Sequence, residues 1–76
     1  DYEVIEAEII ETSELINKEL KNANLPDTIR IGAVLRNKEI IIPRSNFVFK
    51  KKDIVVFLAQ RDQLSTVENM FRISSF

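Results

Sequence analysis

The chain has 76 residues, of which 45% are hydrophobic and 30% are charged, and its net charge at pH 7 is -1. A chain this short buries only about 60% of its unfolded surface, so it forms one domain with one small core. It contains no Cys and no His, which excludes disulfides, thiol and imidazole catalysis, and the usual zinc ligands. No activated nucleophile and no Gly-rich phosphate loop are present either, so no catalytic or metal site is predicted and an enzyme is not expected.

Charge is distributed unevenly along the chain. The first 14 residues carry six acidic side chains and no basic one, whereas residues 36–52 carry six basic side chains against the single acid Glu39. Two faces of opposite sign are therefore expected. Solvated edges are the simpler interpretation and a dedicated binding patch is the alternative. No apolar run approaches the roughly 20 residues that span a bilayer.

The first two predicted elements are a strand and a helix. Apolar and polar residues alternate over residues 3–10, which is typical of a half-exposed strand. Ser13 is a good N-cap for the amphipathic helix predicted over residues 14–23. The apolar stripe of this helix consists of Leu15, Ile16, Leu20 and Ala23. Because so short a helix is marginal alone, it should pack against the sheet.

A β-hairpin is predicted next. Residues 28–35 alternate, and the apolar run 40–42 follows a short polar turn, which is the pattern of two paired strands. Asn37 tolerates the positive φ of a type I′ turn, but Lys38 stands where Gly is usual. The turn is therefore expected to be strained or to use a longer loop.

The second half of the chain is predicted to supply a central strand and a last helix. Phe47 and Phe49 return to the core before a charged turn at residues 50–53. The continuous, β-branched run 54–59 predicts a central strand covered on both faces. A second amphipathic helix begins near Asp62. Its apolar face consists of Leu64, Val67, Met70 and Phe71.

These elements predict an α+β domain with a four-stranded sheet and two helices, in the order β-α-β-β-β-α. A chain of this size has little left to cover the second face of the sheet, so a homodimer is expected. The candidate interface positions are Val4, Val34 and one side of Ile40, Ile41 and Ile42.

Five ordered segments together resemble the TrkA C-terminal (RCK_C-type) domain. They are VIEAEI (4–9), LINKEL (15–20), IGAVLRN (31–37), IIIPR (40–44) and KDIVVF (52–57). The family usually has Gly where Asn17, Lys38, Ser45 and Lys52 stand. Its Gly-Asp before the last strand survives as Lys52-Asp53, and Asp53 is expected to fix the turn by bonding nearby amides.

The resemblance implies one domain over residues 1–76, excised from a longer protein. It would be cytoplasmic, pair with itself, and follow an RCK N-terminal domain, where any NAD or ATP would bind. Through a membrane potassium channel or transporter subunit, the assembly would lie at the inner face of the cell membrane and control gating. Similar domains are also attached to other antiporters and permeases, so potassium is the favoured ion.

The resemblance also implies an alternative, because some domains of the Ktr branch bind cyclic di-AMP between two protomers. The corresponding positions here are Leu25, Pro26, Arg30, Arg36, Pro43 and Arg44. Arginines can clamp phosphates, and the aliphatic side chains can flank a base. However, the segment Leu25-Pro26-Asp27 replaces an Arg-containing stretch of those binders, and Asp27 would repel a phosphate. A regulatory assembly domain is therefore preferred over a small-ligand sensor.

Nucleic-acid binding is the third class considered. Lys50, Lys51 and Lys52 lie near Phe47 and Phe49, and basic residues beside aromatic ones can bind single strands. The two phenylalanines share one face and are better explained as core. No nucleic-acid partner is therefore expected.

Overall fold

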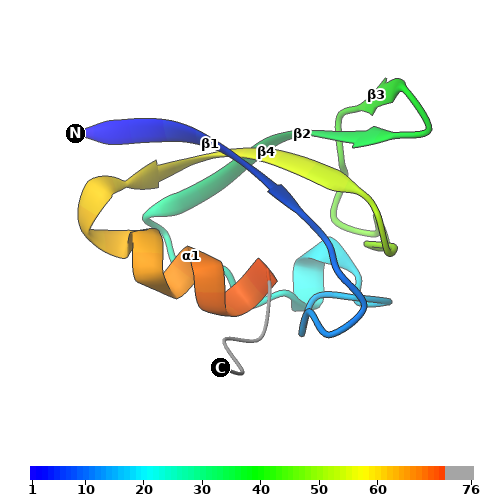
Figure 1. Ribbon diagram of the computed structural model, residues 1–76, viewed down its shortest axis with the longest axis horizontal. Helices are drawn as coiled ribbons and strands as arrows, with labels where there is room; N and C mark the ends of the chain where they lie inside the picture. The colour runs from blue at the N-terminus through cyan, green and yellow to red at the C-terminus, as the bar shows by residue number, and fades with distance from the viewer. Residues whose placement is uncertain (72–76) are drawn as a thin grey trace.

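The computed structural model describes residues 1–71, which form an antiparallel four-stranded sheet and one α-helix (Figure 1). The strands are β1 (Tyr2–Glu8), β2 (Ile29–Arg36), β3 (Glu39–Ile41) and β4 (Ile54–Gln60). Their order in the sheet is β1-β4-β2-β3. Every neighbouring pair is antiparallel. The prediction that β4 is a central strand is therefore confirmed.

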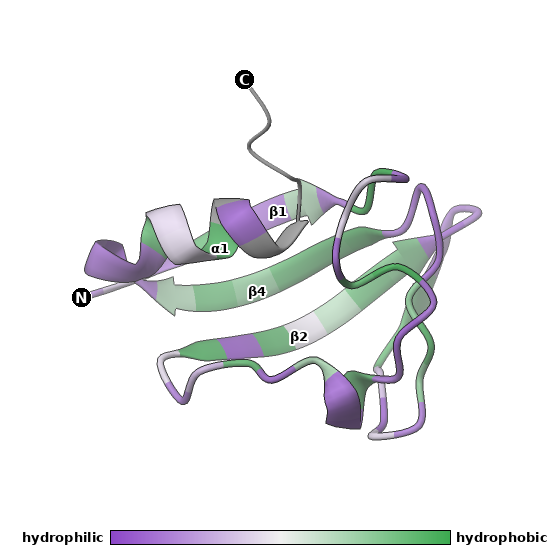
Figure 2. Ribbon diagram, turned by 90° about the horizontal axis from the view of Figure 1, so that it is seen from below, coloured by the Kyte–Doolittle hydropathy of each residue, from purple (hydrophilic) through white to green (hydrophobic). Residues whose placement is uncertain are grey.

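The core lies on one face of the sheet. The helix α1 (Leu64–Phe71) and the segment between β1 and β2 both lie on this side, which we call the inner face (Figure 1, Figure 2). Val55, Phe57 and Ala59 of β4 are buried there, whereas Leu58 between them is 43% exposed. The prediction that β4 is covered on both faces is therefore wrong for this chain. An apolar run alone does not reveal that one of its faces is open.

A β-bulge at Gly32 changes which side chains of β2 face the core. The register of β2 against β4 shifts between Ile31, which pairs with Phe57, and Ala33, which pairs with Val56. Because side chains alternate with a period of two, one extra residue exchanges the two faces of a strand. Val34 is consequently 0% exposed, and its prediction as an interface position is wrong.

The helix predicted over residues 14–23 is replaced by a turn and a short 3₁₀-helix, η1 (Leu20–Asn22). The turn ends at Asn17, whose φ of 63° is left-handed. The chain then bonds to the segment before β4: the Leu20 N–H donates to Phe47 O (2.7 Å) and the Phe49 N–H donates to Lys18 O (3.0 Å). These tertiary bonds replace the helical ones. The predicted face still packs inward, since Leu15 and Ala23 are buried.

Of the two alternatives predicted for the β2–β3 turn, the structure contains the short turn with positive φ values and not the longer loop. Asn37 and Lys38 have φ values of 52° and 68° and connect the pair Arg36–Glu39, as a two-residue type I′ hairpin requires. The buried Ser13 hydroxyl accepts the Leu15 N–H at 3.2 Å, so Ser13 caps the turn.

The C-terminal helix begins two residues later than expected. A 3₁₀-helix, η2 (Arg61–Gln63), leads into α1, which begins at Leu64. Val67 is buried and Leu64 is half-buried against the inner face. The side chains of Met70 and Phe71, predicted on the same helical face, lie outside the described part of the structure.

Candidate functional site

An ion pair between Arg36 and Asp53 organises the end of the sheet nearest the β2–β3 turn. Arg36 Nε donates to Asp53 Oδ1 at 2.8 Å, and Nη2 donates to Oδ2 at 2.6 Å. The arrangement is bidentate, which fits the planar guanidinium. The Asp53 side chain is 1% exposed and that of Arg36 is 31% exposed, so the pair is shielded from water on the carboxylate side.

The same two residues also fix the loop that leads into β4. Arg36 Nη2 donates to Val48 O at 2.9 Å, and its guanidinium lies 4.8 Å from the centre of the Phe47 ring. Asp53 Oδ2 accepts the Lys50 N–H at 2.8 Å, which confirms that Asp53 fixes the turn. The hydrogen bond to Asp53 raises the pKa of Arg36 above its ordinary value, although burial opposes this. Arg36 therefore stays charged and acts primarily as an internal tie.

Sequence reasoning did not pair Arg36 with Asp53. A signal was nevertheless present, because opposite charges flank the ends of two apolar strands. Leu35 pairs with Ile54, so the next residues outward on the two strands, Arg36 and Asp53, come opposite each other. The signal becomes informative only when the order and register of the strands are known, and local sequence patterns do not specify these.

The structure distributes the six predicted ligand residues over both faces and both ends of β2. Arg30 pairs with the outward-facing Leu58 and is exposed. Arg36 follows the bulge by four residues and lies on the inner side, roughly 20 Å from Arg30 along the strand. These two arginines are thus not brought together within one chain.

The remaining four predicted ligand residues lie in loops. Leu25 packs against the core, and Pro26 O accepts the Ile29 N–H at 3.0 Å where β2 begins. Pro43 is half-buried and Arg44 is exposed, in the loop after β3. Of the six predicted ligand residues, only Arg30 and Arg44 are exposed.

No described element lies over the side of the sheet opposite to the inner face (Figure 1), and this side carries exposed aliphatic side chains. Val4, Leu58 and Ile40 are 70%, 43% and 72% exposed, and they belong to β1, β4 and β3. We call this side of the sheet the outer face. Half-buried aliphatic side chains lie on it as well: Ala33, Leu35, Ile54 and Val56. Such a surface is typical of a protein contact.

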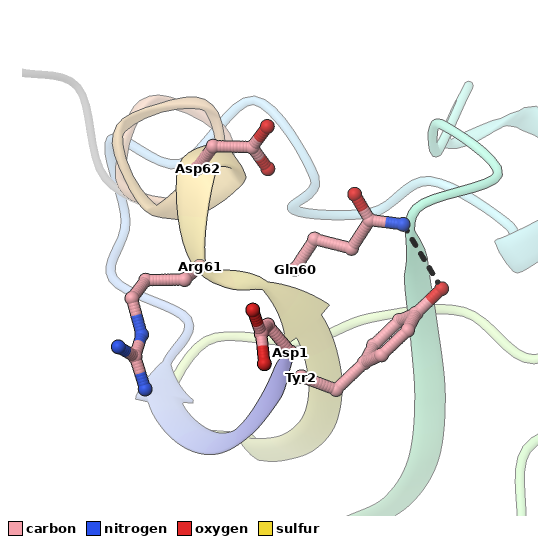
Figure 3. A pocket seen from close by; sticks show the side chains of 5 residues that line it. All are labelled: Asp1, Tyr2, Gln60, Arg61 and Asp62. Atoms are coloured by element: carbon pink, nitrogen blue, oxygen red, sulfur yellow. Dashed lines mark hydrogen bonds between the residues drawn. The ribbon is translucent and has the colours of Figure 1, made fainter.

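A hollow lies at the end of the sheet opposite to the Arg36–Asp53 pair (Figure 3). It has a volume of about 420 Å³ and is lined by Asp1, Tyr2, Gln60, Arg61 and Asp62. Gln60 Nε2 donates to the Tyr2 hydroxyl at 3.2 Å, and Arg61 Nε donates to Glu3 at 2.9 Å. Gln60 and Tyr2 thus bond each other across the hollow, and the Arg61 guanidinium is paired with a carboxylate beside it.

Among the side chains that the structure describes, no group of three or more His, Cys, Asp or Glu is placed to hold a metal ion. In the same part of the chain, no helix combines the length and apolar character needed to cross a bilayer.

Comparison with known proteins gives consistent matches. Residues 4–72 match the model of the TrkA-C domain. The chain is 42% identical, over 95% of its length, to the Trk system potassium uptake protein TrkA of Azorhizobium caulinodans, of which it spans 16%. It is 30% identical, over 93% of its length, to the K(+)/H(+) antiporter NhaP2 of Shewanella sp. (strain ANA-3), of which it spans 12%.

The fold also matches solved structures. The RCK C domain of the potassium transport protein KtrA, solved in complex with cyclic di-AMP, superimposes with a TM-score of 0.78 at 22% identity. The match covers 91% of this chain and 82% of that domain. At this identity the likeness concerns the fold. Because the family model matches nearly the whole chain, from residue 4 to residue 72, the chain belongs to the TrkA-C domain family.

Proposed function

We propose that this chain is a non-catalytic regulatory and assembly domain of a potassium-uptake system. In this role it controls the gating of a membrane potassium transporter from the cytoplasmic side, as one module of a longer regulator that also contains an RCK N-terminal domain. The family match over residues 4–72 carries the proposal. The names of the Trk relatives support potassium as the ion.

Self-association through the outer face would give such a module its assembly role. The exposed aliphatic side chains of the outer face suit a second copy, because a sheet packs well against another sheet. The face also carries both signs of charge, with Glu6 and Glu8 on β1 and Arg30 on β2. A two-fold arrangement can set these opposite charges against each other.

Light scattering on the 76-residue chain tests this proposal. We expect the mass of a dimer with or without cyclic di-AMP. Leu58→Glu should shift the mass toward the monomer, because it places a charge in the apolar contact. Asn22→Glu is the matched control, since it adds the same charge at an exposed position on the inner side. A wild-type monomer at all concentrations would contradict self-association.

A small-ligand sensor is the second candidate. The fold likeness to a domain solved with cyclic di-AMP favours it, and Arg30 and Arg44 remain exposed for a phosphate. The bonding of Arg36 to Asp53 and the presence of Asp27 weigh against it. A monomer that pairs only when cyclic di-AMP is added would make the sensor the leading function. An unchanged melting temperature with cyclic di-AMP would count against it.

A further inference from the structure

We propose that the chain binds a phosphate group in a basic hollow at the end of the sheet. The hollow has a volume of about 200 Å³ and lies between the β2–β3 turn and the turn before β4. Its lining residues are Arg36, Asn37, Lys50, Lys51, Lys52 and Asp53. Four cationic residues and one acidic residue thus line the hollow, and this balance favours an anion. The site does not depend on the function proposed above.

The protein neutralises this charge only in part. The single carboxylate of the hollow, Asp53, is already bonded to Arg36. Glu11 lies 3.6 Å from Lys51, but their side chains are 77% and 52% exposed, so water screens the pair. Three lysines of the two turns remain to be explained.

These three lysines have no acidic partner among the side chains that the structure describes. Lys50 Nζ lies 3.3 Å from the neutral amide oxygen of Asn17. Lys52 lines the hollow, and Lys38 belongs to the turn that contributes Asn37. An anion in the hollow would supply the missing counter-charge.

The backbone indicates that the lysine side chains are not there for local structure. Lys38 and Lys52 have φ values of 68° and 76°, in the left-handed region that is unfavourable for residues other than Gly, Asn and Asp. The other described left-handed residues are all asparagines: Asn17, Asn24 and Asn37. Asn at positions 38 and 52 would fit the same turns with less strain. The conformation of the two turns therefore does not explain why these positions carry lysine.

The hollow is also rigid and small. The Lys52 N–H donates to Ile9 O and the Ile9 N–H to Asp53 O, both at 2.7 Å, so the turn is held in place before any ligand arrives. Its volume of about 200 Å³ lies below the roughly 300 Å³ at which drug-sized pockets begin. It suits one phosphate group, supplied either by a free phosphate or by the headgroup of an anionic lipid, and not a whole dinucleotide.

Titration of the ¹⁵N-labelled chain with pyrophosphate tests the free form of the ligand. At constant ionic strength, we expect amide shifts confined to residues 36–38 and 50–53. Lys52→Asn should weaken binding about fivefold, the value expected for one close charge contact in water, while the melting temperature stays equal or rises. Lys21→Gln removes the same charge from η1 and should leave binding unchanged.

Sedimentation with vesicles tests the lipid form. Binding to phosphatidylglycerol vesicles but not to phosphatidylcholine vesicles, with the same dependence on Lys52, would assign the site to a headgroup. Binding of pyrophosphate alone would assign it to free phosphate. The proposal is overturned if neither probe binds beyond a sodium chloride control, or if Lys21→Gln weakens binding as much as Lys52→Asn.

Discussion

Arg30 and Arg36 belong to the same strand, yet their surroundings differ completely. Arg30 is exposed on the outer face beside Leu58, whereas Arg36 is bonded on the inner side to the buried Asp53. Six residues apart, they would share one face of a regular strand. The extra residue at Gly32 separates them. One bulge thus decides which arginine serves the fold and which remains available for a partner.

The largest expected effect contrasts neighbouring residues of β4. Phe57→Ala should lower the free energy of unfolding by about 3–5 kcal/mol, because it leaves a cavity in the core. Leu58→Ala, one residue away on the outer face, should cost about 1 kcal/mol or less. Chemical denaturation at low protein concentration measures both. Similar losses at the two positions would mean that the two faces of the sheet are not distinct.

The two arginines provide the next test. Arg36→Met should destabilise by about 2–4 kcal/mol, because it leaves a buried carboxylate without its partner. Arg30→Met should change stability by about 0.5 kcal/mol or less. The denaturation midpoints of the two variants measure this difference. A larger loss of stability in Arg30→Met than in Arg36→Met would contradict the placement of the two arginines on opposite faces.

The contribution of Arg36 to the free energy of unfolding should not change with pH over the ordinary working range, because Arg36 stays charged there. Its pKa is raised in the folded state, so its stabilisation is complete below the unfolded pKa and is lost only as pH rises through the folded one. Both pKa values lie far above the range in which proteins are usually handled. Between about pH 6 and 10 the guanidinium therefore stays charged in both states.

The smallest expected effect concerns the bulge residue itself. In Gly32→Ala the new Cβ would lie 3.7 Å from Val56 O, an ordinary contact, and the φ of Gly32 is not left-handed. Stability should therefore change by about 0.5 kcal/mol or less. A loss of more than about 2 kcal/mol would show that the bulge requires glycine and not merely an additional residue.

Local patterns predicted much of this molecule. The alternation of residues 3–10, the hairpin with its Asn37-Lys38 turn and the bond of Asp53 to the Lys50 N–H were all predictable, because each depends on residues close together in sequence. The apolar faces predicted for residues 14–23 and for the C-terminal helix were correct in part, since Leu15, Ala23 and Val67 are buried. The surroundings of the candidate ligand residues were not predictable in this way, because their neighbours in space are distant in sequence.

The sequence by itself determined the class of domain, the strands and their turns, since periodicity and turn residues act locally. Only the tertiary structure decided the rest. Bonds from residues 17–21 to residues 45–49 replaced a predicted helix, and a register shift at Gly32 placed Val34 and Arg36 on the inner side. Both outcomes depend on pairing between distant segments, whose register one strand or helix cannot specify alone.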